Sequence, residues 1–204
     1  MKNEFKVISH FIEKNSKILD VGCGDGELMK ILNDTKTKNI RGLELSKINV
    51  QKCISKGLTV IEGNAENDLK QFPNLSFDYV ILSQTLQAFL NPENVMNELL
   101  RVGKKAIVTI PNFGFWKVRL QLLFKGTMPV TENLPNEWHN TPNLHMCTIK
   151  DFFNFCISRK INIYNALALN SNQDDWIEKK SIITNKNLEK KNFWSEIGIF
   201  LLER

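Results

Sequence analysis

Three closely spaced glycines follow a short apolar run that ends in an acidic residue, within the stretch Ile18–Glu27. Glycine is needed where a turn takes a positive φ and where the backbone must approach a ligand closely. Gly26 comes one place earlier than the last glycine of the G-x-G-x-x-G loop that holds a dinucleotide pyrophosphate, and Glu27 stands in that place. A carboxylate there disfavours NAD. Asp20 at the strand end suits the cationic amino-acid tail of S-adenosylmethionine (SAM), so Asp20, Gly22, Cys23 and Gly24 are predicted to bind it.

A second acidic residue ends the next apolar segment, residues 40–44. Glu44 lies 24 residues after Asp20, which is the length of one strand–helix–strand unit. In Rossmann-like folds a carboxylate at this place accepts hydrogen bonds from ribose hydroxyls. We therefore assign Glu44 and the adjacent Leu45 to the cofactor site. The alternative is a turn that is rich in glycine only for packing.

Strand and helix patterns alternate along the chain. Helical spacing of Phe5, Ile8, Phe11 and Ile12 predicts an N-terminal amphipathic helix. Further helices are predicted from Glu27, from Ser46 to Gly57 with Val50 and Ile54 buried, from Pro92 to about Val102, and from the capping sequence Thr148-x-x-Asp151. Strands are predicted at 18–21, 40–44, 58–61, 77–82 and 106–110, and the closing apolar segments are 161–169 and 197–202.

This order predicts an α/β fold with a doubly wound, Rossmann-like sheet, mostly parallel with a C-terminal antiparallel strand. Residues 1–204 are expected to form one domain, with a helical or loop insertion at about 112–147 after the fifth strand. Ligands of such sheets lie beyond the carboxyl ends of the strands. Asn64 and Ala65 follow the third strand and could read the adenine edge, although Asn64 could also be an ordinary turn residue. Ser83 and Gln84 follow the fourth, where the alternative for Ser83 is helix capping.

Composition excludes several classes of protein. The net charge of +5, from 27 Lys and Arg against 22 Asp and Glu, is too modest to require nucleic acid. The four cysteines form no C-x-x-C pair and no zinc spacing, so neither disulfides nor a metal are expected. Lys2, Glu4 and Lys6 interrupt any leader pattern, and no apolar run approaches the ~18–20 residues of a membrane span. A cytoplasmic protein without a membrane partner is expected.

Three parts of the sequence resemble class I SAM-dependent methyltransferases. They are the D-x-G-x-G motif of Asp20–Gly24, the acidic residue Glu44 and the segment Phe77–Gln87. The segments Arg101–Gly114, Trp116–Leu123, Met128–Thr131 and Thr141–Phe152 resemble one branch of them, the MetW family of methionine biosynthesis. One departure is Asn64, where relatives often have Asp. The resemblance implies a SAM-binding, methyltransferase-fold protein that binds and activates a homoserine O-acyltransferase of the MetX type.

The sequence around the fourth strand gives no catalytic assignment. Ser83–Gln87 is neither the N-P-P-Y of amino-methylating enzymes nor a Pro-Cys nucleophile. His139 and His145 are the only histidines near the predicted site, and a histidine in a polar loop is commonly a structural donor. Catalytic residues stay unassigned. An active small-molecule methyltransferase is the alternative function, and a nucleic-acid modifier is disfavoured by the modest charge.

A partner surface is predicted after the fifth strand. In Phe113–Phe124 apolar side chains fall on two helical faces, one with Phe113, Trp116, Leu120, Leu123 and Phe124 and the other with Phe115, Val118 and Leu122. No acidic residue occurs between Arg101 and Lys125, so the surface that binds here should be anionic. The acyltransferase is the expected partner. The alternative is a lid buried on both sides over the cofactor pocket.

Overall fold

The sheet has seven strands in the order β3-β2-β1-β4-β5-β7-β6. The computed structural model of the chain describes residues 3–131, 133–170 and 182–204. The strands are β1 (Ile18–Val21), β2 (Ile40–Glu44), β3 (Val60–Glu62), β4 (Phe77–Ser83), β5 (Gly103–Pro111), β6 (Asn162–Leu169) and β7 (Ile197–Glu203). Strands β1 to β5 pair in parallel, and β7 runs antiparallel to both of its neighbours, β5 and β6. The predicted α/β fold with a C-terminal antiparallel strand is confirmed.

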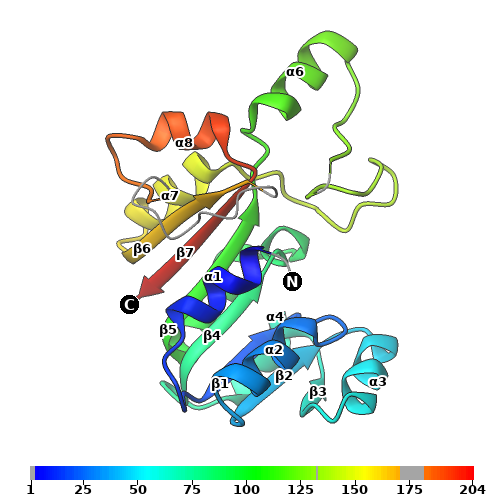
Figure 1. Cartoon of the computed structure of the whole chain (residues 1–204), viewed down its shortest axis with the longest axis vertical. Helices are drawn as coiled ribbons and strands as arrows, with labels where there is room; N and C mark the ends of the chain where they lie inside the picture. Colours follow the sequence, from blue (N-terminus) through cyan, green and yellow to red (C-terminus); the bar gives the residue numbers. More distant parts are fainter. Residues whose placement is uncertain (1–2, 132, 171–181) are drawn as a thin grey trace.

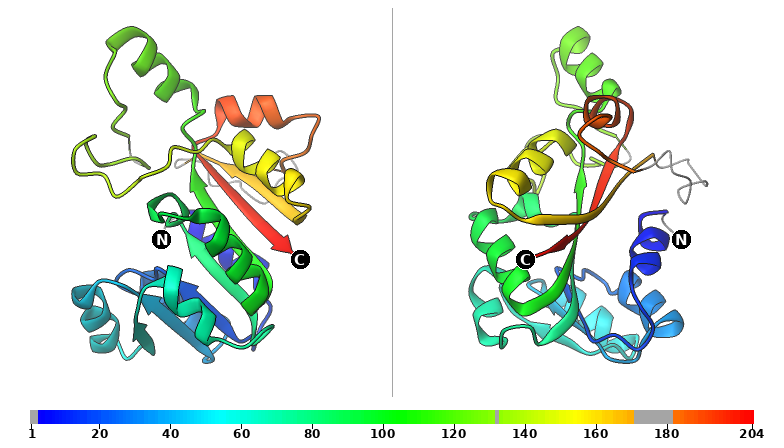
Figure 2. Two further views of the ribbon diagram at one scale, coloured as in Figure 1. Left: turned by 180° about the vertical axis from the view of Figure 1, so that it is seen from behind. Right: turned by 90° about the vertical axis from the view of Figure 1, so that its left-hand side faces the viewer.

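Helices cover both faces of this sheet, as the right-hand view of Figure 2 shows. One face carries α1 (Asn3–Phe11) and α2 (Glu27–Thr35), and the other carries α5 (Pro92–Val102) and α7 (Ile149–Ser158). The remaining helices are α3 (Lys47–Ser55), α4 (Ala65–Asp68), α6 (Trp116–Lys125), α8 (Leu188–Trp194) and the 3-10 turns η1 (Leu69–Gln71) and η2 (Leu86–Ala88). Because the central strands are covered on both sides, their sequences read as nearly continuous apolar runs.

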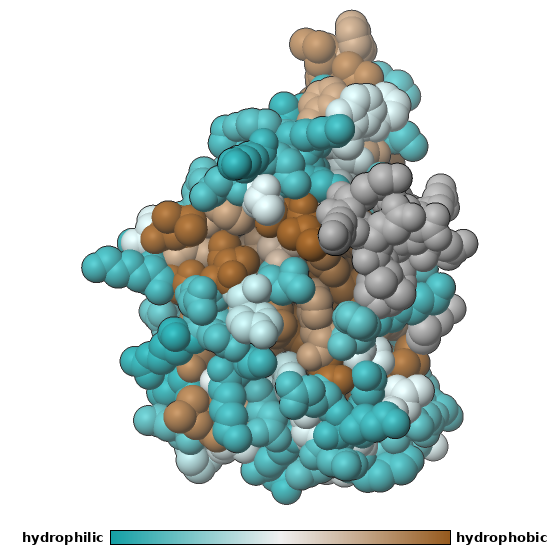
Figure 3. All heavy atoms as spheres, turned by 60° about the vertical axis from the view of Figure 1, so that its left-hand side comes forward, coloured by the Kyte–Doolittle hydropathy of each residue, from teal (hydrophilic) through white to brown (hydrophobic). Residues whose placement is uncertain are grey.

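The segment between β5 and α7 leaves the body of the protein. Helix α6 stands at the top of Figure 1, away from the sheet. Figure 3 shows apolar side chains gathered at the same end of the molecule. Within the described ranges, no helix is long and apolar enough to cross a membrane.

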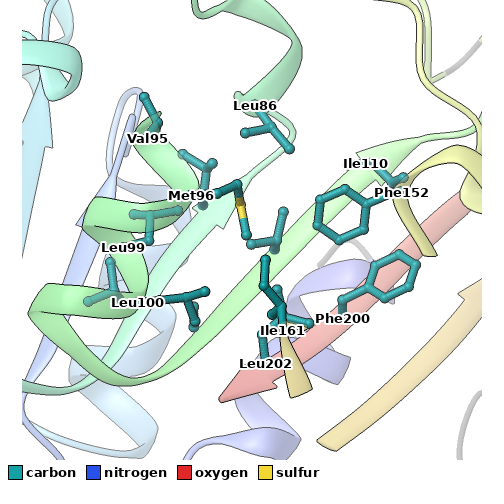
Figure 4. Close-up of a cluster of buried hydrophobic side chains, with 14 of the residues drawn as sticks. Leu86, Val95, Met96, Leu99, Leu100, Ile110, Phe152, Ile161, Phe200 and Leu202 are labelled. Carbon is teal, nitrogen blue, oxygen red and sulfur yellow. The ribbon is translucent and has the colours of Figure 1, made fainter. Parts of the chain in front are cut away.

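The larger core lies under α5 and α7. Figure 4 shows Leu99 and Met96 of α5 facing Phe152 of α7 and Phe200 of β7. The Phe152 and Phe200 rings meet edge to face with centroids 4.7 Å apart, a favoured aromatic geometry. Helix α7 begins where the sequence predicts, because Thr148 and Asp151 form a complete capping box. This core fixes the carboxyl ends of β4 and β5.

Several element predictions were wrong in detail. Ile54 was expected in the core, yet it is 60% exposed, and α3 buries Val50 and Cys53 instead. The third strand begins at Val60, later than expected, because the Leu58 amide still donates to the Cys53 carbonyl at the end of α3 (3.1 Å). Helices α4 and α8 were not predicted. Both are short, and short helices carry too few apolar positions to show a period.

Candidate functional site

The glycine loop after β1 is held in a left-handed conformation. Gly22, Gly24 and Gly26 have φ values of +67°, +57° and +81°. A Cβ on Gly22 would lie 2.8 Å from Cγ2 of Thr85, whereas a Cβ on Gly24 would meet nothing within 4 Å. Gly22 is therefore required for packing as well as for its φ. The space above Gly24 is open, as a loop that approaches a ligand requires.

Glu44 connects the end of β2 to this loop. Its Oε2 accepts a hydrogen bond from the Gly24 amide (2.9 Å), and its Oε1 accepts one from the Ser46 amide (2.8 Å). The side chain is 9% exposed. A carboxylate fixed in this way keeps lone pairs for further donors, because each oxygen can accept more than one hydrogen bond.

Asp20 is the least satisfied charged group of the site. It is 2% exposed, in the middle of the sheet between Gly42 and Ile81. Its carboxylate has no hydrogen bond or ion pair with any other residue that the structure describes. Burial, with smaller contributions from Glu44 and Glu4, raises the pKa of Asp20 to about 8. A bound cation would reverse this effect.

Glu4 of α1 was missed by the sequence analysis. Its carboxylate accepts hydrogen bonds from Ser83 Oγ (2.6 Å), from Gln84 Nε2 (2.5 Å) and from Thr109 Oγ1, and the residue is 4% exposed. The available signal was an acidic residue four places before Ile8, on the apolar face of a predicted helix. Its partners lie 79 to 105 residues away in the sequence, which no local pattern shows.

Glu4, Asp20 and the glycine loop line one acidic cavity of about 200 Å³. Glu44 is not a lining residue and reaches the cavity only through its hydrogen bond to the Gly24 amide. Among the residues that the structure describes, its lining comprises Glu4, Phe5, Asp20, Gly22, Cys23, Gly24, Asp25, Glu27, Leu28, Ser83 and Gln84, with no Lys, Arg or His. Asp25 is neutralised by Lys56, whose Nζ lies 2.8 Å from its Oδ2. The other carboxylates have no cation among the lining residues. The acidic cavity therefore favours a cationic ligand and opposes a pyrophosphate.

Leu45, Asn64 and Ala65, which were also predicted for the site, are not among the residues that line the acidic cavity. Leu45 is 68% exposed directly after Glu44. Asn64 is the N-cap of α4: its Oδ1 accepts from the Glu66 amide (2.9 Å), and Ala65 begins that helix. Asn64 thus has a structural role as a helix cap. Ser83 does not cap a helix, because its hydroxyl donates to Glu4.

The described lining offers no activated thiol and no imidazole. Burial, followed by the charge of Asp20, raises the pKa of Cys23, so this thiol stays protonated. His139 and His145 are absent from the lining, and His139 lies exposed with Nδ1 3.5 Å from Glu137. In the part of the chain that the structure describes, no group of three His, Cys, Asp or Glu side chains could hold a metal ion. The arrangement can bind and orient a cation.

Comparison with known sequences decides the family. The profile of the family described as methionine biosynthesis protein MetW matches residues 2–202. The chain belongs to the MetW family. A bifunctional methionine biosynthesis protein MetXA/MetW of Rhodopirellula baltica is 35% identical over 153 residues, which is 71% of this MetW-family chain and 25% of that protein. A ubiquinone/menaquinone biosynthesis C-methyltransferase UbiE of Campylobacter jejuni is 26% identical over 113 residues. The chain thus spans about a quarter of the first relative and 47% of the second.

Solved structures show the same fold. A SAM-dependent methyltransferase from Mesorhizobium loti superposes with a TM-score of 0.69 at 15% identity, covering 98% of this chain and 97% of that one. The [4+2]-cyclase SpnF superposes with a TM-score of 0.67, also at 15% identity, covering 98% and 80%. A methyltransferase and a cyclase thus share this architecture. Membership of the fold does not by itself establish methyl transfer.

Proposed function

We propose that this MetW-family protein acts in cytoplasmic methionine biosynthesis by binding SAM and associating with a homoserine O-acyltransferase of the MetX type. The observation that carries the SAM proposal is Asp20, a buried carboxylate without a partner in a cavity that has no cation. SAM offers an ammonium and a sulfonium at one end and a ribose at the other. Asp20 would face the cationic end, and Glu44, with Leu45, Asn64 and Ala65 beside it, would take the nucleoside.

The partner proposal rests on the fused MetXA/MetW relative and on the outer half of α6. Fusion of two chains in one organism is consistent with association of the separate chains in another. In α6, Leu123 and Phe124 are 73% and 77% exposed. The inner half is different: Phe115 and Val118 are buried against Leu134, and Trp116 lies 6.2 Å from Trp194, centroid to centroid. Exposed apolar side chains in a continuous patch mark an interaction site.

The two apolar faces of this segment differ in burial. Phe115 and Val118 of one face pack inward, whereas Leu120, Leu123 and Phe124 of the other face are exposed, and Leu122 is exposed as well. We therefore propose Leu120, Leu123 and Phe124 as the apolar docking surface. Lys117 and Lys125 are exposed beside it, so an acidic rim on the acyltransferase would complement it.

Calorimetry with SAM and NAD tests the cofactor proposal. We expect SAM to bind and NAD to give no heat, because the lining carboxylates repel a pyrophosphate. Glu44→Ala should weaken SAM binding by about 1–3 kcal/mol through loss of charge-assisted hydrogen bonds to the ribose. Tight NAD binding, or the absence of binding by any adenosyl ligand, would overturn the proposal.

Co-purification with the acyltransferase of the same organism tests the partner proposal. Phe124→Asp should break the complex and leave SAM affinity unchanged, because large aromatic anchors dominate interfaces. Leu90→Asp is the matched control, since Leu90 is 78% exposed and lies outside α6. An intact complex combined with lost SAM affinity in Phe124→Asp would instead identify this segment as a lid.

A further inference from the structure

A second cavity lies on the other face of the sheet, between the first turns of α5 and α7. Its volume is about 430 Å³. Leu86 of η2, Met96 of α5, and Phe152 and Phe155 of α7 form its apolar walls, and Figure 4 shows the first three at one end of the core. It shares no lining residue with the acidic cavity. We call it the apolar cavity.

One polar side chain in the lining is unsatisfied. Gln87 of η2 is 1% exposed, and neither its Nε2 nor its Oε1 has a hydrogen-bond partner. Its backbone carbonyl is engaged, because it accepts from the Leu144 amide (2.8 Å) and the His145 amide (3.0 Å). Buried side-chain amides are nearly always hydrogen-bonded, so a donor and an acceptor left side by side need explaining.

The charges at the rim restrict what could satisfy this amide. Glu93 and Asp151 are the acidic side chains of the described lining, which also includes the imidazole of His145 but no Lys or Arg. Glu93 is paired with Arg159 (2.6 Å), and Asp151 caps α7, so neither requires an added cation. The carboxylate of Asp151 would repel an anion, whereas the charge of Glu93 is balanced by Arg159. Burial raises the pKa of the Cys147 thiol to about 12, which excludes a thiolate adduct at neutral pH.

We propose that the apolar cavity binds a small uncharged molecule that presents an amide edge, as a carboxamide or a lactam does, on an apolar body. Such an edge offers one acceptor and one donor side by side, the complement of the Gln87 amide. The apolar body would lie against Met96, Phe152 and Phe155, where sulfur and aromatic contacts are favourable. Because Gln87 is covered, entry requires part of the lining to shift. Met146, which is 63% exposed, is the lining side chain most free to do so.

Titration by ¹H–¹⁵N NMR with four small probes tests this inference. Benzamide has the amide edge and the apolar body, toluene lacks the edge, benzoate carries a charge, and acetamide lacks the body. We expect saturable binding of benzamide with shifts at Gln87 and Met96, and binding at least about tenfold weaker for the other three. Gln87→Met keeps the length of the side chain and removes its polar atoms. It should lower the benzamide affinity about tenfold and leave that of toluene unchanged.

Two further variants complete the test. Met96→Trp should fill the apolar cavity and abolish binding of both aromatic probes. Asn97→Ala, one position along α5 and exposed, should change nothing. The inference is overturned if no probe binds, as expected of a cavity that holds only water. It is equally overturned if benzamide binds wild type and Gln87→Met alike.

Discussion

The acidic and the apolar cavity lie at the same end of the sheet and border the same short segment, yet they differ in the polar group that each leaves unsatisfied. In the acidic cavity this group is the carboxylate of Asp20, buried at 2% exposure. In the apolar cavity it is the neutral amide of Gln87, buried at 1% exposure. Other buried polar side chains near the acidic cavity, such as Glu4 and Glu44, have hydrogen-bond partners within the chain.

This difference teaches what kind of ligand each cavity can accept. A buried carboxylate is stabilised by a cation or by hydrogen-bond donors, whereas a buried amide needs both a donor and an acceptor and no charge. The same end of one sheet can thus serve two unlike ligands. The four predictions below test whether the two cavities are as independent and as different as their lining suggests.

The largest effect is expected from Gly24→Val. A β-branched side chain would occupy the open space above the loop and resist the φ of +57°, so SAM affinity should fall about 100-fold or more, roughly 3 kcal/mol. Benzamide binding in the apolar cavity should not change. Gly126→Val is the matched control, because Gly126 has a φ of +62° and equally open surroundings at the end of α6. SAM affinity retained in a folded Gly24→Val variant would refute the loop geometry.

The second prediction concerns pH. Because the pKa of Asp20 is about 8 in the folded chain and 3.8 in the unfolded one, the native state holds an additional proton between these values. The stability of the ligand-free protein should therefore fall as the pH rises from 4 to 8. A cation binds only after this proton leaves, so the Kd for SAM should fall about tenfold per pH unit between pH 6 and 7.5, below the range in which the ligand's own amine titrates.

Calorimetry over that pH range makes the measurement, with Asp20→Asn as the comparison. The variant should bind SAM weakly and without the pH dependence. Benzamide affinity should be the same in wild type and Asp20→Asn at each pH, since Asp20 does not line the apolar cavity. A Kd for SAM that does not vary with pH would contradict the assignment of Asp20 to the cationic end.

The third prediction separates SAM from S-adenosylhomocysteine, which lacks the sulfonium charge. Glu4→Gln removes a negative charge from the lining while keeping one side-chain oxygen as an acceptor for Ser83 and Thr109. We expect this change to lower the affinity for SAM about tenfold and the affinity for S-adenosylhomocysteine less than about threefold, because only SAM carries two positive groups. Glu27 is an exposed carboxylate of the lining. Glu27→Gln should change the affinity for either ligand by less than about twofold, because solvent screens this charge. Equal losses for both ligands in Glu4→Gln would assign Glu4 a purely structural role.

The smallest effect is on stability and compares two glutamines of one turn. Gln87→Met removes an unsatisfied amide, so the ligand-free protein should gain about 1 kcal/mol, which raises Tm by roughly 2–4 °C for a chain of this size. Gln84→Met removes an amide that donates to Glu4 at 2.5 Å and should lower Tm instead. Thermal unfolding of both variants decides the matter. A drop in Tm for Gln87→Met would mean that its amide is satisfied in solution.

The sequence predicted those parts of the site whose signals are local. The strand ending in Asp20 and the glycine turn after it lie within a few residues, and Glu44 follows at the spacing of one strand–helix–strand unit. Glu4 could not be assigned, because its partners Ser83 and Thr109 come from distant strands. The apolar cavity was missed for the same reason, since η2, α5 and the residues before α7 meet only in the folded chain.

Helix α6 illustrates a different limit. Periodicity showed that Phe113–Phe124 is apolar on more than one side, but it could not show which residues the following segment covers. Leu134, which follows α6 in the sequence, packs on Phe115 and Val118 and leaves Leu123 and Phe124 exposed. Packing against residues outside the helix therefore decided which side chains remain available to a partner.

The five residues from Ser83 to Gln87 form a wall common to both cavities, with Ser83 and Gln84 lining one and Leu86 and Gln87 lining the other. Thr85, between these two pairs of residues, packs against Gly22, and Gln84 has a φ of +50°. The turn therefore has little freedom to move. A ligand that shifted the turn from one side would change the free energy of binding on the other. Thermodynamic reciprocity then requires SAM to alter the affinity for the uncharged ligand by the same factor that this ligand alters the affinity for SAM.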